Sequence, residues 1–404
     1  MEERARAYLD TLIASLQSTG HTETAQVLTR AKDELGRSLW CEMTDDLMLA
    51  IRDPLVLESA YELHENVLRT TRVDMSPMAY VKLLHCICFS PNSTFEKASE
   101  LIDGAIATLT SISAEQGGNA ACCIQALLLL DRNNAEKESA SGRFAARARR
   151  ILDTVEAFIH SKQMHEVEPV LAALHCQARG KDYETRRQYT MFYKNAFETV
   201  SSAERAEMPI IESDMLTLAF KTAIAALLSE ETYNFGKFLN DRHFTDRLSS
   251  SPTHAWILEW LKLCNDGKVE EFEKYAASHG AQIEAYPDLC SALPSILHKV
   301  RLMALLHLVF YTPFNERTFT FDVIGRRCAV EAERVEPLLL AALAQGIVMG
   351  RIDGLTREVH ITWVEPRVLS LQEVKGLAVH VSRWKEKVLG LLQSVTETTQ
   401  ETQK

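Results

Sequence analysis

The sequence predicts a mainly α fold that changes character once, near residue 312. Gly 16 and Pro 11 together make about 7% of the 404 residues, against roughly 12% in average proteins. So few breakers leave little room for the many turns of an all-β fold. Apolar residues recur at helical spacing through most of the chain, and only "VHITWV" at 359–364 alternates apolar and polar residues as a strand does.

Residues 1 to about 311 have the pattern of one helix after another, joined by short polar segments. For example, "ARAYLDTLIASLQ" ends at "STGHTE", and "LWCEMTDDLMLAI" ends at "RDP". Many of the helices pair as hairpins that recur about every 35–40 residues, without a strict consensus. This pattern predicts a TPR-like helical-repeat solenoid, an architecture that offers extended surfaces and seldom a buried active site.

One polar segment, "DRNNAEKESASGR" at 131–143, is expected to be an exposed mobile loop. A basic cluster begins at its end, formed by Arg143, Arg147, Arg149 and Arg150. These side chains could contact nucleic acid. No aromatic residues are interleaved to stack on bases, so a solvated helix face is the favoured interpretation.

From residue 312 onward the predicted elements follow the order of a winged helix. "TFTF" at 318–321 is β-prone, "FDVIGRRC" forms a short helix, and "ERVEPLLLAALAQ" forms a second helix that Gly346 ends. "IVMGRI" and "VHITWV" follow as two strands around the turn signal Asp353-Gly354.

The last strand is predicted to bury Val359, Ile361 and Trp363, because alternate residues of a strand point to the same face. Trp363 should anchor this face on the two helices, while His360 and Thr362 face outward. Pro366 ends the strand. We also expect this strand to lie beside a neighbouring protein, so that the wing acts as a joint between subunits.

A capping box from Ser370 to Glu373 predicts a helix directly after the wing. Apolar residues then recur in steps of three and four, the heptad pattern, with valine at each a position and Leu or Trp at d. This stripe consists of Val374, Leu377, Val381, Trp384, Val388, Leu391 and Val395. Docking on the chain's own winged helix would use only the first turns, so the length of the stripe favours a bundle with partner helices.

Composition indicates a soluble intracellular protein. A net charge of −11 argues against a dedicated binder of nucleic-acid phosphates. The nine cysteines include no Cys-x-x-Cys pair, which favours a reducing compartment. "MEERARAYLD" lacks the apolar core of a signal peptide, and charged residues interrupt "SILHKVRLMALLHLVFY", so we expect no membrane partner.

No motif predicts a catalytic, cofactor or metal site: the phosphate loop, the nucleophile elbow and the His-Glu-x-x-His zinc helix are all missing. "HCIC" at 85–88 and "HC" at 175–176 could supply metal ligands or a thiol–imidazole pair. Both lie in apolar segments with helical residue spacing, where core packing is the favoured interpretation. Glu331, Glu333 and Glu336 in the second helix of the winged helix argue against DNA binding.

A helical-repeat array that ends in an acidic winged helix and a further helix resembles the PCI-domain proteins. This family is shared by the proteasome lid, the signalosome and a translation initiation factor. The resemblance is carried by "LWCEMTDDLMLAIRDP" (39–54), "YNFGKFL" (233–239), "WLKLCNDGKVEEF" (260–272) and "GRIDGLTREVHITWVEPRVLSLQEVKG" (350–376). These stretches are similar to one non-ATPase subunit of the 26S proteasome lid, strongly over about 230–390. Pro337 departs from the family pattern, so the helix there is expected to begin near Val335.

The resemblance implies a non-catalytic scaffold of the proteasome regulatory particle, located in cytoplasm and nucleus and acting in ubiquitin-dependent protein degradation. Its implied partners are other PCI-domain lid subunits and the deubiquitinating subunit, with a ubiquitin receptor as a further candidate. The expected domains are a solenoid (1–230), the helical part of a PCI domain (231–311), its winged helix (312–369), a bundle helix (370–395) and a disordered tail (396–404). Two alternatives stay open: a scaffold of the translation initiation factor or signalosome, and an RNA-binding PCI adaptor.

Overall fold

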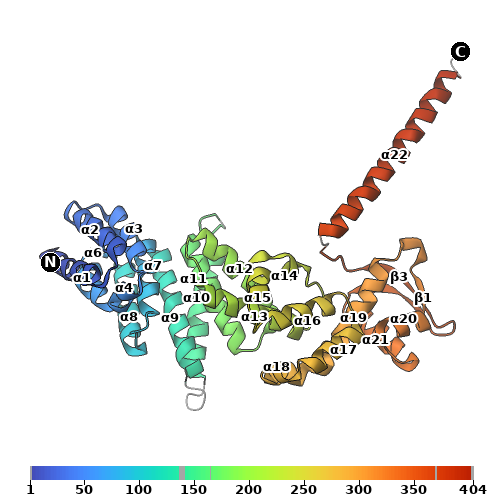
Figure 1. Cartoon of the computed structure of the whole chain (residues 1–404), viewed down its shortest axis with the longest axis horizontal. Helices are drawn as coiled ribbons and strands as arrows, with labels where there is room; N and C mark the ends of the chain where they lie inside the picture. The colour runs from blue at the N-terminus through green and yellow to red at the C-terminus, as the bar shows by residue number, and fades with distance from the viewer. Residues whose placement is uncertain (1, 136–141, 164, 369–370, 402–404) are drawn as a thin grey trace. The chain divides into compact units, whose positions relative to one another are not determined.

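The computed structural model describes residues 2–135, 142–163, 165–368 and 371–401 (Figure 1). The chain divides into two compact units, an N-terminal unit of Met1–Ile211 and a C-terminal unit of Glu212–Lys404. Helices dominate the described residues of both units, and the only strands among them form one three-stranded sheet. The predicted mainly α fold is confirmed.

The N-terminal unit is a succession of helices in which each packs on the next in the chain, as α2 does on α3 and α8 on α9. It contains α1 (Glu2–Thr19), α2 (Thr22–Gly36), α3 (Trp40–Ala50), α4 (Pro54–Glu58), α5 (Ala60–Leu63), the π-helix η1 (His64–Leu68), α6 (Arg69–Thr71), α7 (Pro77–Cys88), α8 (Phe95–Ser111), α9 (Glu115–Ala135), α10 (Arg143–Ser161), α11 (Pro169–Thr185) and α12 (Tyr189–Arg205). Helix α9 also packs on α11, so the helices form layers rather than isolated hairpins.

Helix α8 shows how the sequence builds one such element. The Thr94 hydroxyl accepts a hydrogen bond from the Lys97 amide and caps the first turn. Ala98, Ile102, Ala105 and Leu109 follow at helical spacing, and all four are buried. After the helix, Ser113 adopts a left-handed conformation with φ 57°, and the Ala114 amide donates to the Leu109 carbonyl at 2.9 Å. This turn reverses the chain and starts the next helix.

Buried ion pairs tie α10 to α11. The fully buried carboxylate of Asp182 accepts a hydrogen bond from Arg149 Nε at 2.9 Å and lies 3.6 Å from Arg186 Nη1. One turn earlier, the buried Arg179 donates to Asp153 Oδ1 at 2.7 Å and also pairs with Glu156. In the basic cluster singled out from the sequence, Arg149 therefore has a structural role, whereas Arg143, Arg147 and Arg150 are exposed.

The segment 131–143, which was predicted to be an exposed loop, is helical at both of its ends. Helix α9 continues to Ala135, and α10 begins at Arg143. The middle of this segment, 136–141, lies outside the described residues.

The C-terminal unit contains a helical part followed by a winged helix. Its elements are α13 (Glu212–Leu228), α14 (Gly236–Asn240), α15 (Arg242–Ser250), α16 (Ala255–Asn265), α17 (Val269–Ser278), α18 (Gly280–Glu284), α19 (Pro287–Phe310), the 3-10 helix η2 (Phe314–Glu316), β1 (Thr318–Thr320), α20 (Phe321–Cys328), the 3-10 helix η3 (Ala332–Arg334), α21 (Val335–Ala344), β2 (Val348–Asp353), β3 (Glu358–Val364) and α22 (Leu371–Glu401). The division at 211 differs from the expected boundary at 230, because α13 packs on α15, α16 and α19.

Helix α19 contains the apolar run whose charged residues were expected to prevent it from spanning a membrane. By length and hydropathy it could cross a bilayer, although the sequence had suggested that its charged residues prevent this. Half of its apolar window is buried in the structure, and it packs on α13, α16, α17 and α20. These contacts make α19 a core helix of the C-terminal unit.

The winged helix has the predicted element order. Its sheet is antiparallel with strand order β1-β3-β2, and β3 pairs with β1 at Thr318–His360 and with β2 at Val348–Val364. Helix α21 begins at Val335, as expected, so that Pro337 lies in the first turn, where its missing amide has no intrahelical partner to lose. Glu333 of η3 and Glu336 of α21 are exposed.

The prediction that Trp363 is buried is wrong. Val359 and Ile361 are buried as expected, but Trp363 is 39% exposed and Val364 takes its place in the core. The cause is a β-bulge: Gly350 lies opposite Ile361 and Met349 opposite Trp363, which leaves Thr362 as an extra residue. One extra residue shifts the side-chain alternation by one position, so Trp363 faces outward. Gly350 permits this close approach, since a Cβ there would lie 2.3 Å from the His360 carbonyl oxygen.

The sheet order also limits how the wing can act as a joint. Strand β3 is the central strand: β2 pairs with it along its length, whereas β1 pairs only with Glu358–His360, so among the described strands the end of β3 at Thr362–Val364 is paired on one side only. The outer face of the sheet does carry exposed side chains, including the cross-strand pair Met349 and Trp363. The surfaces open to the expected contact with a neighbour are therefore this face, the edges of β1 and β2, and the end of β3.

Helix α22 is longer than expected. It continues to Glu401, so the polar segment from 396 is helical as far as that residue rather than disordered. Ser370 of the predicted capping box and residues 402–404 lie outside the described residues. Within α22, side chains are described for 374–379 and 381–392.

We predict that Asp182→Ala lowers the free energy of unfolding by about 3 kcal/mol, because it leaves two arginines without their buried carboxylate. Urea unfolding, monitored by circular dichroism, measures this loss of unfolding free energy. Asp10→Ala, which removes a more exposed pair with Lys32, should cost less than about 1 kcal/mol. Equal losses in the two variants would contradict the structural role of the buried pair.

A second prediction separates the two faces of β3. Ile361→Ala should cost about 2–4 kcal/mol, because its side chain is buried, whereas Trp363→Ala should cost less than about 1 kcal/mol. Thermal unfolding of the two variants compares them. A larger loss for Trp363→Ala would show that the bulge does not form in solution.

Candidate protein-interaction site

The heptad stripe of α22 is exposed at every position whose side chain is described. Val374, Leu377, Val381, Trp384, Val388 and Leu391 are each between 36% and 68% exposed. Val395, the seventh predicted position, lies outside the described side chains. Contiguous apolar surface of this kind is rare on monomeric proteins.

The exposed apolar surface extends slightly beyond the stripe. Val379 and Leu389, which do not belong to a or d positions, are each 51% exposed. Isolated exposed apolar residues are common, so these two carry no argument by themselves. They provide internal controls for the stripe.

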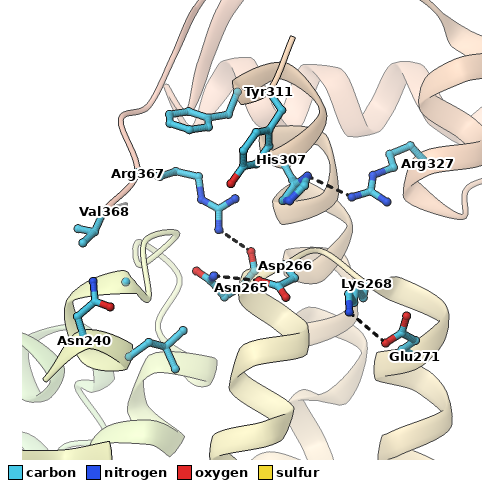
Figure 2. Close-up of a pocket in the computed structure, with 13 residues that line it drawn as sticks. Asn240, Asn265, Asp266, Lys268, Glu271, His307, Tyr311, Arg327, Arg367 and Val368 are labelled. Atoms are coloured by element: carbon cyan, nitrogen blue, oxygen red, sulfur yellow. Dashed lines mark hydrogen bonds and ion pairs between the residues drawn. The ribbon is translucent and has the colours of Figure 1, made fainter. Parts of the chain in front are cut away.

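A short connection, here called the strap (Glu365–Val368), leads from β3 toward α22. Three polar contacts hold the strap on the helical part of the C-terminal unit. Arg367 Nη2 donates to the Asn265 carbonyl oxygen at 2.7 Å, as Figure 2 shows. The Asn234 side chain donates to the Pro366 carbonyl and accepts from the Val368 amide, both at 3.4 Å.

Arg367 lies at the C-terminal end of α16, where unpaired helix carbonyls carry partial negative charge. Burial lowers the pKa of its guanidinium, and the nearby carboxylate of Asp266 opposes this effect. The Arg367 side chain is therefore not a free surface cation. It forms a charged contact between the strap and α16.

A cavity of about 500 Å³ opens beside the strap (Figure 2). It is lined by Gly236, Leu239, Asn240, Asn265, Asp266, Lys268, Glu271, His307, Phe310, Tyr311, Arg327, Arg367 and Val368. Its charges are largely paired: Lys268 lies 3.5 Å from Glu271, and Arg327 Nη2 donates to His307 Nδ1 at 3.2 Å. No nucleophile and base converge in this lining, which fits a packing junction better than an active site.

The segment Tyr233–Gly236, which contacts the strap, packs on a buried lysine through its two aromatic rings. Lys299 of α19 is 5% exposed, and its Nζ donates to the carbonyl oxygens of Ala226 at 2.7 Å and Ser229 at 2.6 Å. It thereby satisfies the carbonyls at the end of α13. The same Nζ lies 5.0 Å from the centre of the Phe235 ring and 5.7 Å from that of Tyr233. Burial lowers the pKa of Lys299 to about 8.

The histidines and cysteines singled out from the sequence are in nonreactive environments. Burial lowers the pKa of His85 and of His175 to about 4, so both rings are neutral at pH 7. Burial raises the pKa of Cys88 to about 12, which keeps it a thiol. Among the described residues, no three His, Cys, Asp or Glu side chains gather as metal ligands would.

Reasoning from the sequence missed the residues that hold the strap. In the sequence, Asn234 and Gly236 stand out only as part of the stretch "YNFGKFL" that resembles the family. Lys299 stands out only as a charge that interrupts the apolar run "SILHKVRLMALLHLVFY". The signal that could have found Lys299 is a single lysine among residues spaced as a buried helix face. Its carbonyl partners lie about 70 residues away in the chain, which no local pattern predicts.

The fold and the exposed helix define a class of protein: a helical-repeat array joined to a winged helix, with a terminal apolar stripe, as in PCI-domain assembly subunits. A family model described as PSD13 N-terminal repeats matches residues 27–261, more than half of the chain. The chain belongs to this family. The resemblance drawn from its sequence, to non-ATPase regulatory subunit 13 of the 26S proteasome, is confirmed.

Two relatives from Arabidopsis thaliana illustrate the similarity. The 26S proteasome non-ATPase regulatory subunit 13 homolog B is 25% identical over 94% of this chain and 95% of the relative. Homolog A is 28% identical over 61% of this chain and 62% of the relative. Eukaryotic translation initiation factor 3 subunit M from Nematostella vectensis is 22% identical over 34% of this chain and 36% of that protein.

We predict that Lys299→Met lowers the free energy of unfolding by about 1–3 kcal/mol, because buried carbonyl oxygens lose their donor. The difference from wild type should grow between pH 8 and 10.5. In that interval the folded chain has released the Lys299 proton while the unfolded chain, with the ordinary pKa of 10.5, still holds it, so alkalinity favours folding at this group. Urea unfolding at several pH values measures both effects.

Lys274→Met, at an exposed position of α17, is the matched control and should leave stability and its pH dependence nearly unchanged. A Lys299→Met variant as stable as this control would show that the lysine does not cap α13.

Proposed function

We propose that this chain is a non-catalytic structural subunit of the lid of the 26S proteasome regulatory particle. In this role it scaffolds lid assembly for ubiquitin-dependent protein degradation. The observation that carries the proposal is the exposed heptad stripe of α22 on a member of the PSD13 family. Lid membership would place the chain in cytoplasm and nucleus.

The stripe supports a bundle of helices as the mode of assembly. Six described positions with a 3.5-residue period match the seam of a coiled coil or helical bundle. At about 25 cal/mol per Å² of apolar surface, covering such side chains contributes several kcal/mol that becomes available only when partner helices arrive. The partners we propose are PCI-domain lid subunits and the deubiquitinating subunit, with a ubiquitin receptor as a further candidate.

The winged helix supports a role in protein contacts rather than in reading DNA. Glu331, Glu333 and Glu336 are all exposed around the start of α21, where a DNA-reading helix needs basic or amide side chains. On the sheet, the outward Trp363 and Met349 offer apolar contact area to a neighbouring protein.

The alternative is the same fold in a translation initiation factor, which the partial similarity to subunit M of initiation factor 3 favours. Purification of the tagged chain from native extract separates the two functions. We expect ATPase-ring and lid subunits to co-purify. Co-purification of small ribosomal subunits in their place would overturn the proposal.

A substitution tests the stripe directly. The double variant Val381→Asp with Val388→Asp places charges at two central a positions, where burial in a bundle is unfavourable. We expect its incorporation into the regulatory particle to fall at least tenfold, while the melting temperature of the isolated chain stays the same. Incorporation is measured as the fraction of tagged chain that sediments with the particle.

The matched control is Val379→Asp with Leu389→Asp, which makes the same chemical change at exposed positions outside the stripe. It should reduce incorporation much less. Wild-type incorporation of the stripe variant would disprove the bundle, and a much lower melting temperature would mean that the stripe packs on its own unit. Removal of 371–404 should likewise block incorporation and leave the remaining chain folded.

A further inference from the structure

Three sequence stretches that lie far apart in the chain meet at one place in the structure. "YNFGKFL" supplies Asn234 and Gly236, "WLKLCNDGKVEEF" supplies Asn265, and "WVEPRVL" supplies the strap. None of these residues is part of the heptad stripe or of the buried face of the wing. We call the surface formed by Asn234, Gly236 and Asn265 the socket.

The fit between strap and socket is close enough to exclude a side chain. A Cβ atom added to Gly236 would lie 2.6 Å from Val368 Cβ and 3.0 Å from the Val368 carbonyl oxygen. Real Cβ contacts of 2.6 Å do not occur, so any larger residue at 236 would displace the strap. Gly236 is buried, and its φ does not lie in the left-handed region, so this close approach is what requires glycine here.

The socket is itself held on the core from below. Phe235, next to Gly236, is fully buried and packs over the Lys299 ammonium group. Asn265 is followed by a turn in which Gly267 has φ 62°, and a Cβ there would lie 2.4 Å from the Ala304 backbone of α19. Both sides of the socket are thus fixed to α19, the central helix of this unit.

We infer that the socket positions the terminal helix for assembly by anchoring the strap close to the start of α22. Without it, the only described attachment of the strap to the unit would be the end of β3, where the Glu365 amide donates to the Ile347 carbonyl at 2.9 Å. A helix that leaves from a fixed point loses less freedom when it joins a bundle, so anchoring favours association. This inference rests on the proposed role of α22 in a bundle.

The test opens the socket and leaves the stripe intact. Gly236→Val inserts side-chain atoms where Val368 lies, and Asn234→Ala removes both of the Asn234 contacts with the strap. Gly280→Val is the control, because a Cβ at Gly280 has no atom within 4 Å. Each variant is made in the full-length chain, and circular dichroism confirms that it is folded.

The first measurement is trypsin cleavage after Arg367, followed by mass spectrometry of the product 1–367. Trypsin must bind the Arg367 side chain, which in the native structure is partly buried and donates to Asn265, so cleavage reports release of the strap. We expect both socket variants to be cleaved at this bond about tenfold faster than wild type and Gly280→Val. Unchanged cleavage in both would show that the socket does not hold the strap in solution and would overturn the inference.

The second measurement is incorporation into the regulatory particle, for which we expect a decrease of at least threefold in both socket variants. Faster cleavage together with wild-type incorporation would overturn the positioning role. If Gly236→Val fails to fold, Asn234→Ala decides both measurements. The proposed function fails by a different result, wild-type incorporation of Val381→Asp with Val388→Asp, so the two failures can be told apart.

Discussion

An amphipathic helix is stable in water only when another surface covers its apolar face, and this requirement organises the whole chain. In the N-terminal unit most helices cover the next, as α8 and α9 do, and most of the buried residues belong to one large core cluster. In the C-terminal unit, α19 serves the same purpose for the surrounding helices and for the winged helix. Helix α22 is the exception, because its described apolar stripe is exposed. The same physical requirement that builds the array is therefore the basis for proposing that partner helices cover α22.

Buried polar groups set the relative positions of helices within each unit. Apolar contacts favour compaction but tolerate small shifts, whereas a buried charge requires its partner at hydrogen-bond distance. Asp182 aligns α11 with α10 through Arg149, and Lys299 aligns α19 with the end of α13. Neither group is placed to do chemistry. Both illustrate how charged side chains inside a scaffold specify geometry rather than reactivity.

The junction of strap and socket depends on particular side chains more strictly than the apolar core does. Close approach at Gly236 and backbone-directed hydrogen bonds from Asn234 and Arg367 each depend on one side chain type. A core position, by contrast, accepts several apolar residues of similar volume. The aromatic core next to the socket adds to this, since Trp260 stacks on Phe272 with ring centres 4.9 Å apart and Phe238 stacks on Phe244 at 5.3 Å.

Elements whose formation depends on neighbours in the chain could be predicted from the residues alone. Helical spacing, few breakers and the placement of Pro337 were enough to predict the array, the winged-helix order and the start of α21 at Val335. The period of the heptad stripe is likewise a local property, and the structure places the stripe in one helix. Features that depend on distant partners became visible only in the folded chain. The bulge at Thr362 turned Trp363 outward because Gly350, on another strand, allows the close approach to His360. Pairing on both sides made β3 the central strand, and carbonyls at the end of α13 turned a lysine in an apolar run into a buried cap. Local periodicity reports which side chains share a face, but the pairing of segments far apart in the chain decides which face is covered.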